Sequence, residues 1–370
     1  MSVSATAEQK ALREAVSALM TRHFTEERVR ELMATDTAFD EAAWQELADM
    51  GLLGLLIPEE QGGAGAGYSD LGIVVEELGS ALFCGPFLPS AVLTPALLLA
   101  TADDAEQGSV LPKLAAGELV ATVAFAEGNS TEVPTELETT ATESGGQWTL
   151  TGEKKFVLDA GIAGVVYVLA QTDAGPSVFA AEADAPGLEV TLCNTVDLTR
   201  KLSNVRFDNT PARLVGQAGA GADAFGAAVQ AGSIALVSEQ AGGAQRAMRL
   251  AVDYAKTRFQ FGRAIGSFQA VKHMCTDMLL EAESSVSAAR HVAAAFDAGA
   301  DGAAADLALA QGYCSDAYVY VAATGIQVHG GIGFTWEHAS HLYLRRARSD
   351  AQLLGTPASH RERYLTLKGA

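Results

Sequence analysis

Two segments in the last third of the chain combine residue types that bind phosphate groups. In the first, Arg258 ends a helical pattern that Gly262 breaks, and Gln269 opens the next helical stretch. In the second, Gln327 precedes a turn that holds three glycines within four residues. Arginine offers a planar fork of donors to a phosphate, and glycines let backbone N–H groups approach an anion closely. Each segment alone is more often a structural turn than a binding site, but the two together indicate a phosphate-bearing cofactor.

Helices must position both segments, because apolar residues recur at helical spacing on either side of them. This pattern predicts helices over 225–258, 268–298 and 303–328, which are long enough to form a bundle. Helical spacing also dominates the first part of the chain, from about residue 8 to 117.

Between these helical parts, short runs rich in Val, Phe, Tyr and Thr alternate with turn residues and predict an antiparallel sandwich or barrel. The expected strands cover 120–126, 148–151, 165–172, 178–181, 188–192 and 205–207, with an exposed loop over 129–144. We therefore expect an α+β protein with three domains. These are an N-terminal helical domain over 1–118, a middle β domain over 119–215 and a C-terminal helical domain over 216–370.

Four short motifs, in this order, resemble those of the acyl-CoA dehydrogenase family, and the resemblance extends over essentially the whole chain. They are Trp44 to Pro58 with its Gly51-Leu-Leu-Gly-Leu core, Gly152-Glu-Lys154-Lys-Phe156, the Arg258 to Gln269 segment, and Gln327 with Gly330-Gly331. The resemblance implies the family fold, in which the C-terminal domain is like a four-helix bundle. It also implies FAD-dependent oxidation of the Cα–Cβ bond of an acyl-CoA thioester.

The resemblance further implies which residues hold the cofactor FAD. In family oligomers the flavin lies between two subunits, and one subunit reaches across to grip the pyrophosphate and adenosine of the other. The matching positions here are Arg258, Gln260, Phe261, Gln269, Gln327, Gly330, Gly331 and Thr356.

The residues that family members use for proton abstraction are missing. The usual base is a glutamate before a Gly-Thr pair, and in this chain Leu354 precedes Gly355-Thr356. A branch of the family carries the base 26 residues before the flavin-binding arginine, and that position is Gly232. Neither residue accepts a proton, so we expect no catalytic base at either position.

The flavin-ring side departs from the family as well. Hydroxyl residues usually face the polar edge of the ring, but the matching positions read Ala126 and Leu158. The chain thus keeps the residues that reach across and lacks those on the ring side. We hypothesise that it is the subunit without the base in an α2β2 hetero-oligomer, similar to the actinobacterial acyl-CoA dehydrogenases that degrade sterol side chains.

Two other hypotheses remain. Glu239 lies seven residues after Gly232 on roughly the same helix face, so it is a candidate for a displaced base in a self-sufficient homotetramer. Pairing with a nearby arginine such as Arg246 is the structural alternative, which we favour. A non-catalytic scaffold subunit is the third hypothesis, and the retained grip residues argue against it. The family implies an acyl-CoA substrate and an electron-transfer flavoprotein as acceptor.

Other patterns predict no further chemistry. His338 and His341 with Glu337 and His329 could suggest a metal, but no further ligand follows at a helical interval, and we expect none. The basic run from Arg345 to Arg348 could touch a CoA phosphate or form ion pairs on a helix surface.

Composition excludes several classes of protein. With 370 residues, 25 Lys and Arg against 45 Asp and Glu, the formal net charge is −20, which excludes a nucleic-acid binder that works through a basic face. Four cysteines stand far apart without metal or disulfide spacing. Because no membrane span or leader pattern is present, we expect a cytoplasmic protein.

Overall fold

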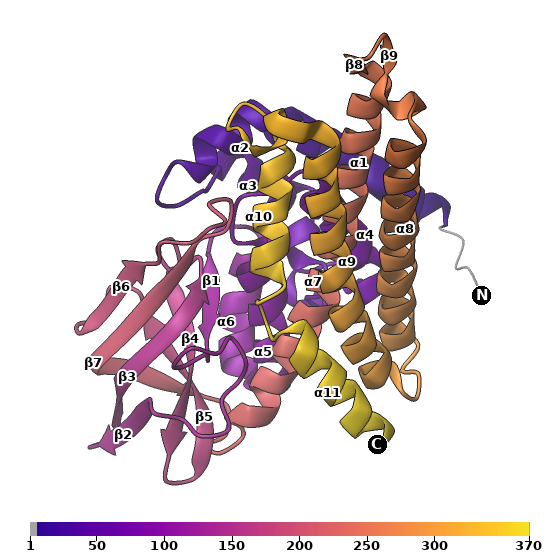
Figure 1. The fold of residues 1–370 in the computed structure, drawn as a ribbon. Helices are drawn as coiled ribbons and strands as arrows, with labels where there is room; N and C mark the ends of the chain where they lie inside the picture. Colours follow the sequence, from indigo (N-terminus) through magenta and orange to yellow (C-terminus); the bar gives the residue numbers. More distant parts are fainter. Residues whose placement is uncertain (1–5, 370) are drawn as a thin grey trace. The chain divides into compact units, whose positions relative to one another are not determined.

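The computed structural model describes residues 6–369, which form two compact units. The helical unit contains the described residues up to 30, residues 68–83 and those from 233 onward, and the β unit contains 31–67 and 84–232. Along the chain, which Figure 1 colours by residue number, helices come first, strands follow, and helices return at the end. This order confirms the expected fold class.

The helical unit holds long helices and one small hairpin. It contains α1 (Ala7–His23), the start of α2 (Glu26–Met33), α4 (Tyr68–Ser80), most of α7 (Gly221–Thr257), β8 (Phe259–Gln260), β9 (Arg263–Ala264), the 3₁₀ turn η4 (Ile265–Ser267), α8 (Gln269–Asp297), α9 (Ala303–His329), the 3₁₀ turn η5 (Gly330–Phe334), α10 (Ser340–Asp350) and α11 (Pro357–Lys368).

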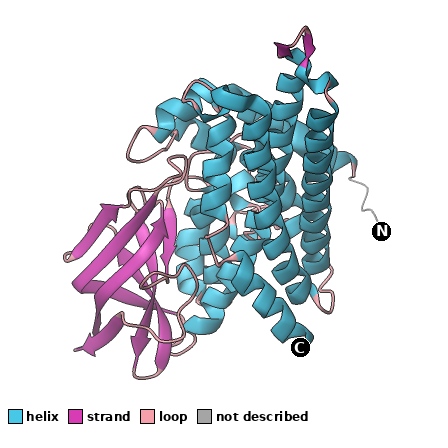
Figure 2. Cartoon of the chain, in the orientation of Figure 1, coloured by secondary structure: helices cyan, strands magenta, loops and turns pink. Residues whose placement is uncertain are grey.

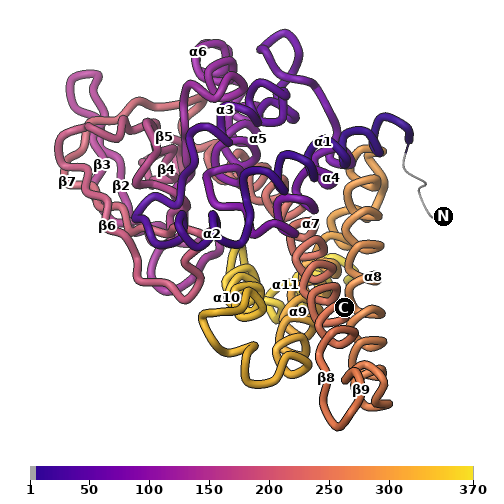
Figure 3. Tube along the Cα trace, turned by 90° about the horizontal axis from the view of Figure 1, so that it is seen from above, coloured from indigo at the N-terminus to yellow at the C-terminus, as the bar shows by residue number. Residues whose placement is uncertain are grey.

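Helix packing in this unit follows the apolar stripes of the sequence. Ile234 and Val237 of α7 pack with Val286 of α8 and Cys314 of α9 in one buried cluster. Figure 3, seen from above, shows α7, α8 and α9 as neighbouring coils. Helix α9 also packs on α10 and α11, and α4 packs on α1 and α8. The three long helices expected from the sequence are confirmed to within a few residues at each end.

The β unit contains a seven-stranded sheet and short helices. Its helical elements are the end of α2, α3 (Glu41–Asp49), the 3₁₀ turns η1 (Leu52–Gly54) and η2 (Glu59–Gln61), the π-helical η3 (Phe87–Leu93), α5 (Thr94–Thr101), α6 (Asp104–Ala115) and the start of α7. Its strands are β1 (Ala121–Ala124), β2 (Thr140–Ser144), β3 (Gln147–Leu158), β4 (Val165–Thr172), β5 (Gly175–Glu182), β6 (Leu188–Leu192) and β7 (Leu202–Val215), drawn in magenta in Figure 2.

The strand pairings close on themselves, in agreement with the barrel alternative. Going round, β4 pairs with β5, β5 with β7, β7 with β3, β3 with β2, and β2 returns to β4 through Thr140 and Gln171. The expectation of a purely antiparallel sheet is wrong in two places, because β1 and β2 both pair parallel to β4. Leu150, Val168, Phe179 and Phe207 fill the interior.

Strand β2 corrects the expectation of a loop that ends at Ser144. Only one of its five residues is buried, so its composition carried no apolar signal. Its partner explains it: β2 forms a hairpin with β3 through Gly145 and Gly146, whose φ angles are +62° and +82°. Two consecutive residues with positive φ define the two-residue turn whose twist matches a hairpin, so this glycine pair was the signal that could have found β2.

Candidate functional site

The Arg258 segment folds into a hairpin at the end of α7. Helix α7 stops at Thr257, and β8 and β9 then pair through a turn in which Phe261 and Gly262 have φ angles of +52° and +77°. Arg263 places its guanidinium 4.0 Å from the centre of the Phe268 ring, which steadies the return into α8. Figure 1 shows this hairpin projecting beyond the ends of α7 and α8.

The polar residues of the hairpin are exposed. The side chains of Arg258, Gln260 and Gln269 all face solvent, and Phe261 is 90% exposed at the tip. The amide of Gln269 contacts only the ring of His273, at 3.0 Å. Among residues 6–369 no carboxylate pairs with Arg258, so its charge is available to an anion.

The Gln327 segment ends α9 in an open glycine turn. Gly330 has φ +65° and ψ −142°, a conformation that only glycine adopts readily. A Cβ atom built on Gly330 or Gly331 would meet nothing within 4 Å, so the backbone there is open to a ligand. Gln327 is exposed on the last turn of the helix.

The structure brings the two segments to the same end of the helical unit. Tyr254, one turn before Arg258, stacks on His329 at the end of α9, with 4.7 Å between ring centres. Thr356 does not join them, because it lies at the start of α11, which Figure 1 shows at the opposite end of the helical unit from the hairpin. Its hydroxyl instead caps α11 by accepting a hydrogen bond from the backbone N–H of Ser359 at 3.2 Å.

The position of the usual base lies between α10 and α11. Leu354 is buried, 5% exposed, and holds the unfavourable φ of +58°, while Gly355 follows at φ +118°. A left-handed leucine costs about 1–2 kcal/mol. The chain therefore keeps an unusual backbone at a position where its side chain cannot take a proton, and Gly232 in α7 has no side chain at all.

Glu239 is tied into an ion pair in the helical unit. Its carboxylate contacts the guanidinium of Arg346 on α10, and the two residues are 7% and 3% exposed. Arg346 also donates to the carbonyl oxygen of Phe83 at 3.0 Å. The partner is thus Arg346, and the expected pairing with Arg246 is wrong. Arg346 is buried by this pair, so it is not part of a basic surface run.

The ring-side positions belong to the β unit. Ala126 and Leu158 are buried and carry no hydroxyl, and the carbonyl oxygen of Leu158 accepts a hydrogen bond from the Thr122 hydroxyl at 2.6 Å. The residues present on this side therefore offer the polar edge of a flavin no side-chain donor at these two positions.

A buried ion pair that sequence reasoning missed fixes the same region. Lys154 is 0% exposed, and its ammonium lies 2.6 Å from Glu127 and 3.2 Å from the carbonyl oxygen of Phe125. The Glu127 carboxylate accepts backbone hydrogen bonds from Glu138 and Thr139 at 2.6 and 3.0 Å. Burial lowers the pKa of Lys154 to about 8, and Glu127 opposes that shift. Strand β3 holds Gln147, Glu153 and Lys155 as well, so its composition gave no signal that Lys154 is the buried one.

Three histidines cluster where α9 ends and α10 begins: His329 ends α9, His338 precedes α10 and His341 lies in its first turn. The ring centres of His329 and His338 are 4.3 Å apart, and His341 packs on Trp336 at 4.7 Å. Burial lowers the pKa of all three, that of His341 to about 4 with help from Arg345. Within the part of the chain that the structure describes, no three His, Cys, Asp or Glu residues are arranged to hold a metal.

Family models and solved structures match this architecture. Models of the N-terminal, middle and C-terminal domains of acyl-CoA dehydrogenases match residues 6–118, 122–210 and 219–365. The chain is 35% identical to acyl-CoA dehydrogenase IpdE2 of Mycobacterium tuberculosis over 95% of this chain and 94% of that protein. It is 32% identical to acyl-CoA dehydrogenase FadE27 of the same organism over 90% and 89%.

Two solved heteromeric structures are similar throughout. A variant of the Tcur3481–Tcur3483 steroid ACAD superposes with a TM-score of 0.87 at 31% identity, covering 98% of both chains. The ChsE4–ChsE5 complex from Mycobacterium tuberculosis gives a TM-score of 0.91 at 28% identity, covering 100% of this chain and 99% of that chain. Among the described residues, no helix is long and apolar enough to cross a membrane.

These matches extend over nearly the whole chain and define an oxidoreductase of acyl-CoA thioesters that uses FAD. The chain belongs to the acyl-CoA dehydrogenase family.

Proposed function

We propose that this chain is the subunit without the base in a hetero-oligomeric acyl-CoA dehydrogenase, and that it completes the FAD site of a paralogous partner. The observation that carries the proposal is the buried Leu354 in the left-handed position where family members carry the catalytic glutamate. The partner then supplies the carboxylate that takes the α-proton, while FAD, when bound, accepts the β-hydrogen as hydride.

The exposed hairpin and the glycine turn support the other half of the proposal. Arg258, Gln269 and Gln327 face solvent at one end of the helical unit, as residues that reach a neighbouring subunit must. Arg258 would hold the pyrophosphate, and the open backbone at Gly330 and Gly331 would let the adenosine part approach. These residues bind and orient the cofactor of the partner and move no proton.

The ion pair of Glu239 weighs against a displaced base. A carboxylate that is paired with a buried guanidinium is held ionised by that charge and is a weaker proton acceptor than a free one. A self-sufficient homotetramer would have to break this pair before each turnover. The exposed grip residues weigh against a scaffold that binds no cofactor.

The substrate we propose is a steroid-derived or fatty acyl-CoA, because the similar Tcur3481–Tcur3483 structure is described as a steroid ACAD. The paired chains of that structure and of the ChsE4–ChsE5 complex support the proposed paralogous partner. We further propose an electron-transfer flavoprotein as the acceptor and the cytoplasm as the compartment. Both follow from family membership and the sequence.

The test is to express this chain alone and together with a paralogue that carries the glutamate, and to count flavin by native mass spectrometry. We expect about one FAD for every two chains in the complex, and little FAD on this chain alone. Arg258→Gln in this chain should lower the FAD content of the complex, whereas Arg206→Gln, which removes an exposed charge from β7, should not.

The opposite result is equally clear. If this chain alone binds one FAD per protomer and oxidises acyl-CoA, the proposal is wrong and the homotetramer is favoured. If the complex binds no flavin, the scaffold subunit is favoured.

A further inference from the structure

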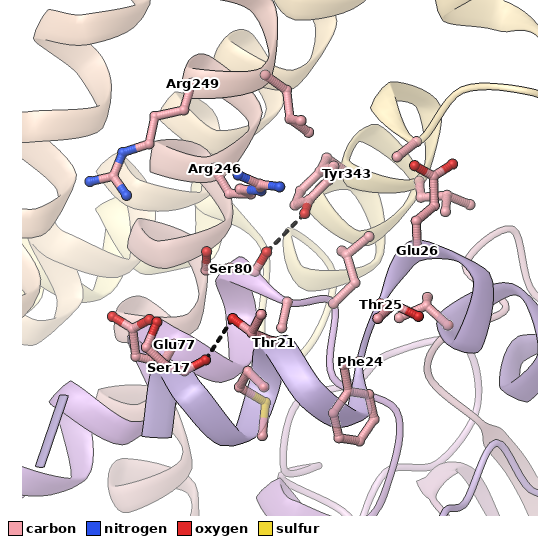
Figure 4. A pocket seen from close by; sticks show the side chains of 17 residues that line it. Ser17, Thr21, Phe24, Thr25, Glu26, Glu77, Ser80, Arg246, Arg249 and Tyr343 are labelled. Atoms are coloured by element: carbon pink, nitrogen blue, oxygen red, sulfur yellow. Dashed lines mark hydrogen bonds between the residues drawn. The ribbon is translucent and has the colours of Figure 1, made fainter. Parts of the chain in front are cut away.

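A cavity of about 400 Å³ lies within the helical unit, away from the segments assigned to FAD. Residues of α1, α2, α4, α7 and α10 line it, and Figure 4 shows them from close by. Its volume is within the range of small-molecule sites. Buried apolar side chains form part of the wall, namely Met20, Phe24, Val29 and Leu342.

The charges around the cavity do not cancel. Glu26 and Glu77 line it, but each is already paired outside the cavity, Glu26 with Arg30 at 2.8 Å and Glu77 with Arg13 at 2.7 Å. Arg13 also contacts Glu76, and that carboxylate has Arg290 as a second partner at 2.9 Å. The carboxylates of Glu26 and Glu77 are therefore compensated by Arg30 and Arg13, neither of which lines the cavity.

Two arginines of α7 that line the cavity have no carboxylate partner among residues 6–369. Arg246 and Arg249 lie one turn apart and both line the cavity. Arg249 contacts only the amide oxygen of Gln245, at 3.3 Å, and neither arginine pairs with a carboxylate anywhere in residues 6–369. Both guanidinium groups therefore leave a positive charge without a carboxylate partner at this cavity.

Arg246 is the better placed of the two. Figure 4 shows its side chain directed toward Tyr343, while Arg249 extends toward the edge of the view. The hydroxyl of Tyr343 donates to the carbonyl oxygen of Ser80 at 2.8 Å, which holds the ring in place. Burial raises the pKa of Tyr343 to about 12, so the phenol stays neutral and does not compensate the guanidinium.

We propose that this cavity binds a small amphipathic organic anion, with its carboxylate at Arg246 and its apolar part against the buried wall. The hydroxyl of Ser17 lines the same cavity and offers a further donor to the anionic group, whereas that of Thr21 already donates to the carbonyl oxygen of Ser17 at 2.8 Å. A guanidinium in a partly enclosed site binds a carboxylate more strongly than one on an open surface, because solvent screens the charge less. The site is independent of the flavin grip.

Octanoate is the probe, and isothermal titration calorimetry on the full chain is the measurement. We expect octanoate to bind, and acetate and octanol to bind at least about tenfold more weakly, since each lacks one half of the recognised chemistry. Arg246→Gln should weaken octanoate binding by about tenfold, the effect of losing one hydrogen bond to a charged group. Arg206→Gln removes the same charge from β7 and should leave the affinity unchanged.

A second variant tests whether binding depends on the volume of the cavity as well as on the charge of Arg246. Thr21→Phe fills the cavity from α1 and should also abolish octanoate binding, while circular dichroism confirms that each variant is folded. Equal affinity in Arg246→Gln and the unsubstituted chain overturns the proposal, and so does octanol binding as tightly as octanoate. Because FAD content depends on Arg258 and not on Arg246, failure here leaves the proposed function untouched.

Discussion

At the scale of single residues, the ion pair of Glu239 and Arg346 has a structural role rather than a catalytic one. The two residues join α7 to α10, and the second donor of Arg346 reaches the end of the segment that follows α4. A buried ion pair adds little stability compared with apolar residues of the same size. Removing one partner is strongly destabilising, because the other charge then stays buried without compensation. We therefore interpret this pair as a clamp between helices.

Glu239→Gln should lower the free energy of unfolding by about 3–5 kcal/mol, because it removes the carboxylate that compensates a buried guanidinium. The double variant Glu239→Leu with Arg346→Met should cost clearly less than the sum of the two single variants. Urea unfolding of the unsubstituted chain, Glu239→Gln, Glu239→Leu, Arg346→Met and the double variant measures both effects. Glu27→Gln on the exposed face of α2 is the control and should change stability by less than about 0.5 kcal/mol.

The same double variant also separates structure from catalysis. Assembled with the paralogous subunit, it should retain most of the acyl-CoA oxidation of the complex. A complete loss of turnover in a folded complex with its flavin in place would identify Glu239 as the base.

At the scale of elements, the turn between β2 and β3 shows how a strand of polar residues is held. The pairing depends on Gly145 and Gly146 rather than on burial, because β2 has only one buried residue. The sheet needs this strand, since β2 is the link through which the ring of pairings returns to β4.

Gly146→Ala should lower the free energy of unfolding by about 1–2 kcal/mol, because alanine at positive φ is strained. Gly226→Ala is the matched control. That glycine lies inside α7 with open space where a Cβ would stand, so alanine should raise stability by about 0.5–1 kcal/mol. Thermal unfolding distinguishes the two, and equal effects at both sites would mean that the turn conformation does not matter.

The three histidines at the junction of α9 and α10 should make the stability of the fold sensitive to acid. Because the pKa of His341 falls from 6.5 to about 4 on folding, the unfolded chain binds more protons between these two values. His329 and His338 shift in the same direction. Stability should therefore fall as the pH drops from 6.5 toward 4.

His341→Gln should reduce this loss, and urea unfolding at pH 7.5 and 5.5 measures it. His273→Gln, at an exposed position of α8, should leave the pH dependence as it is. A steeper acid loss in His341→Gln than in the unsubstituted chain would contradict the assignment.

At the scale of the whole molecule, the order of helices and strands follows from periodicity, and the long helices could be placed within a few residues. Periodicity could not show β2, because its stability comes from a turn and a partner strand rather than from apolar residues. It also could not show the parallel pairings, since these depend on a later strand returning beside an earlier one. The domain limits at 118 and 215 remain a prediction.

The candidate site, too, could be predicted only in part. Residue types alone were enough to predict the break at Gly262 and the glycine turn after Gln327, but not the β8–β9 hairpin, and the role of these segments in binding FAD remains a prediction. The partners of Glu239 and Lys154 could not be found, since each lies far away in sequence: 107 residues separate Glu239 from Arg346, and 27 separate Lys154 from Glu127. Long-range ion pairs leave no periodic signal.

The hairpin after α7 has a consequence for the life of the protein in the cell. Phe259 and Phe261 are 64% and 90% exposed, so a chain that has not yet found its partner presents two aromatic rings to its surroundings. Chaperones and proteases recognise such surfaces, and the supply of unassembled protein is removed accordingly. If the chain assembles with a paralogous partner, as proposed, its abundance should follow that of the partner, because degradation of unassembled chains then sets the ratio of the two.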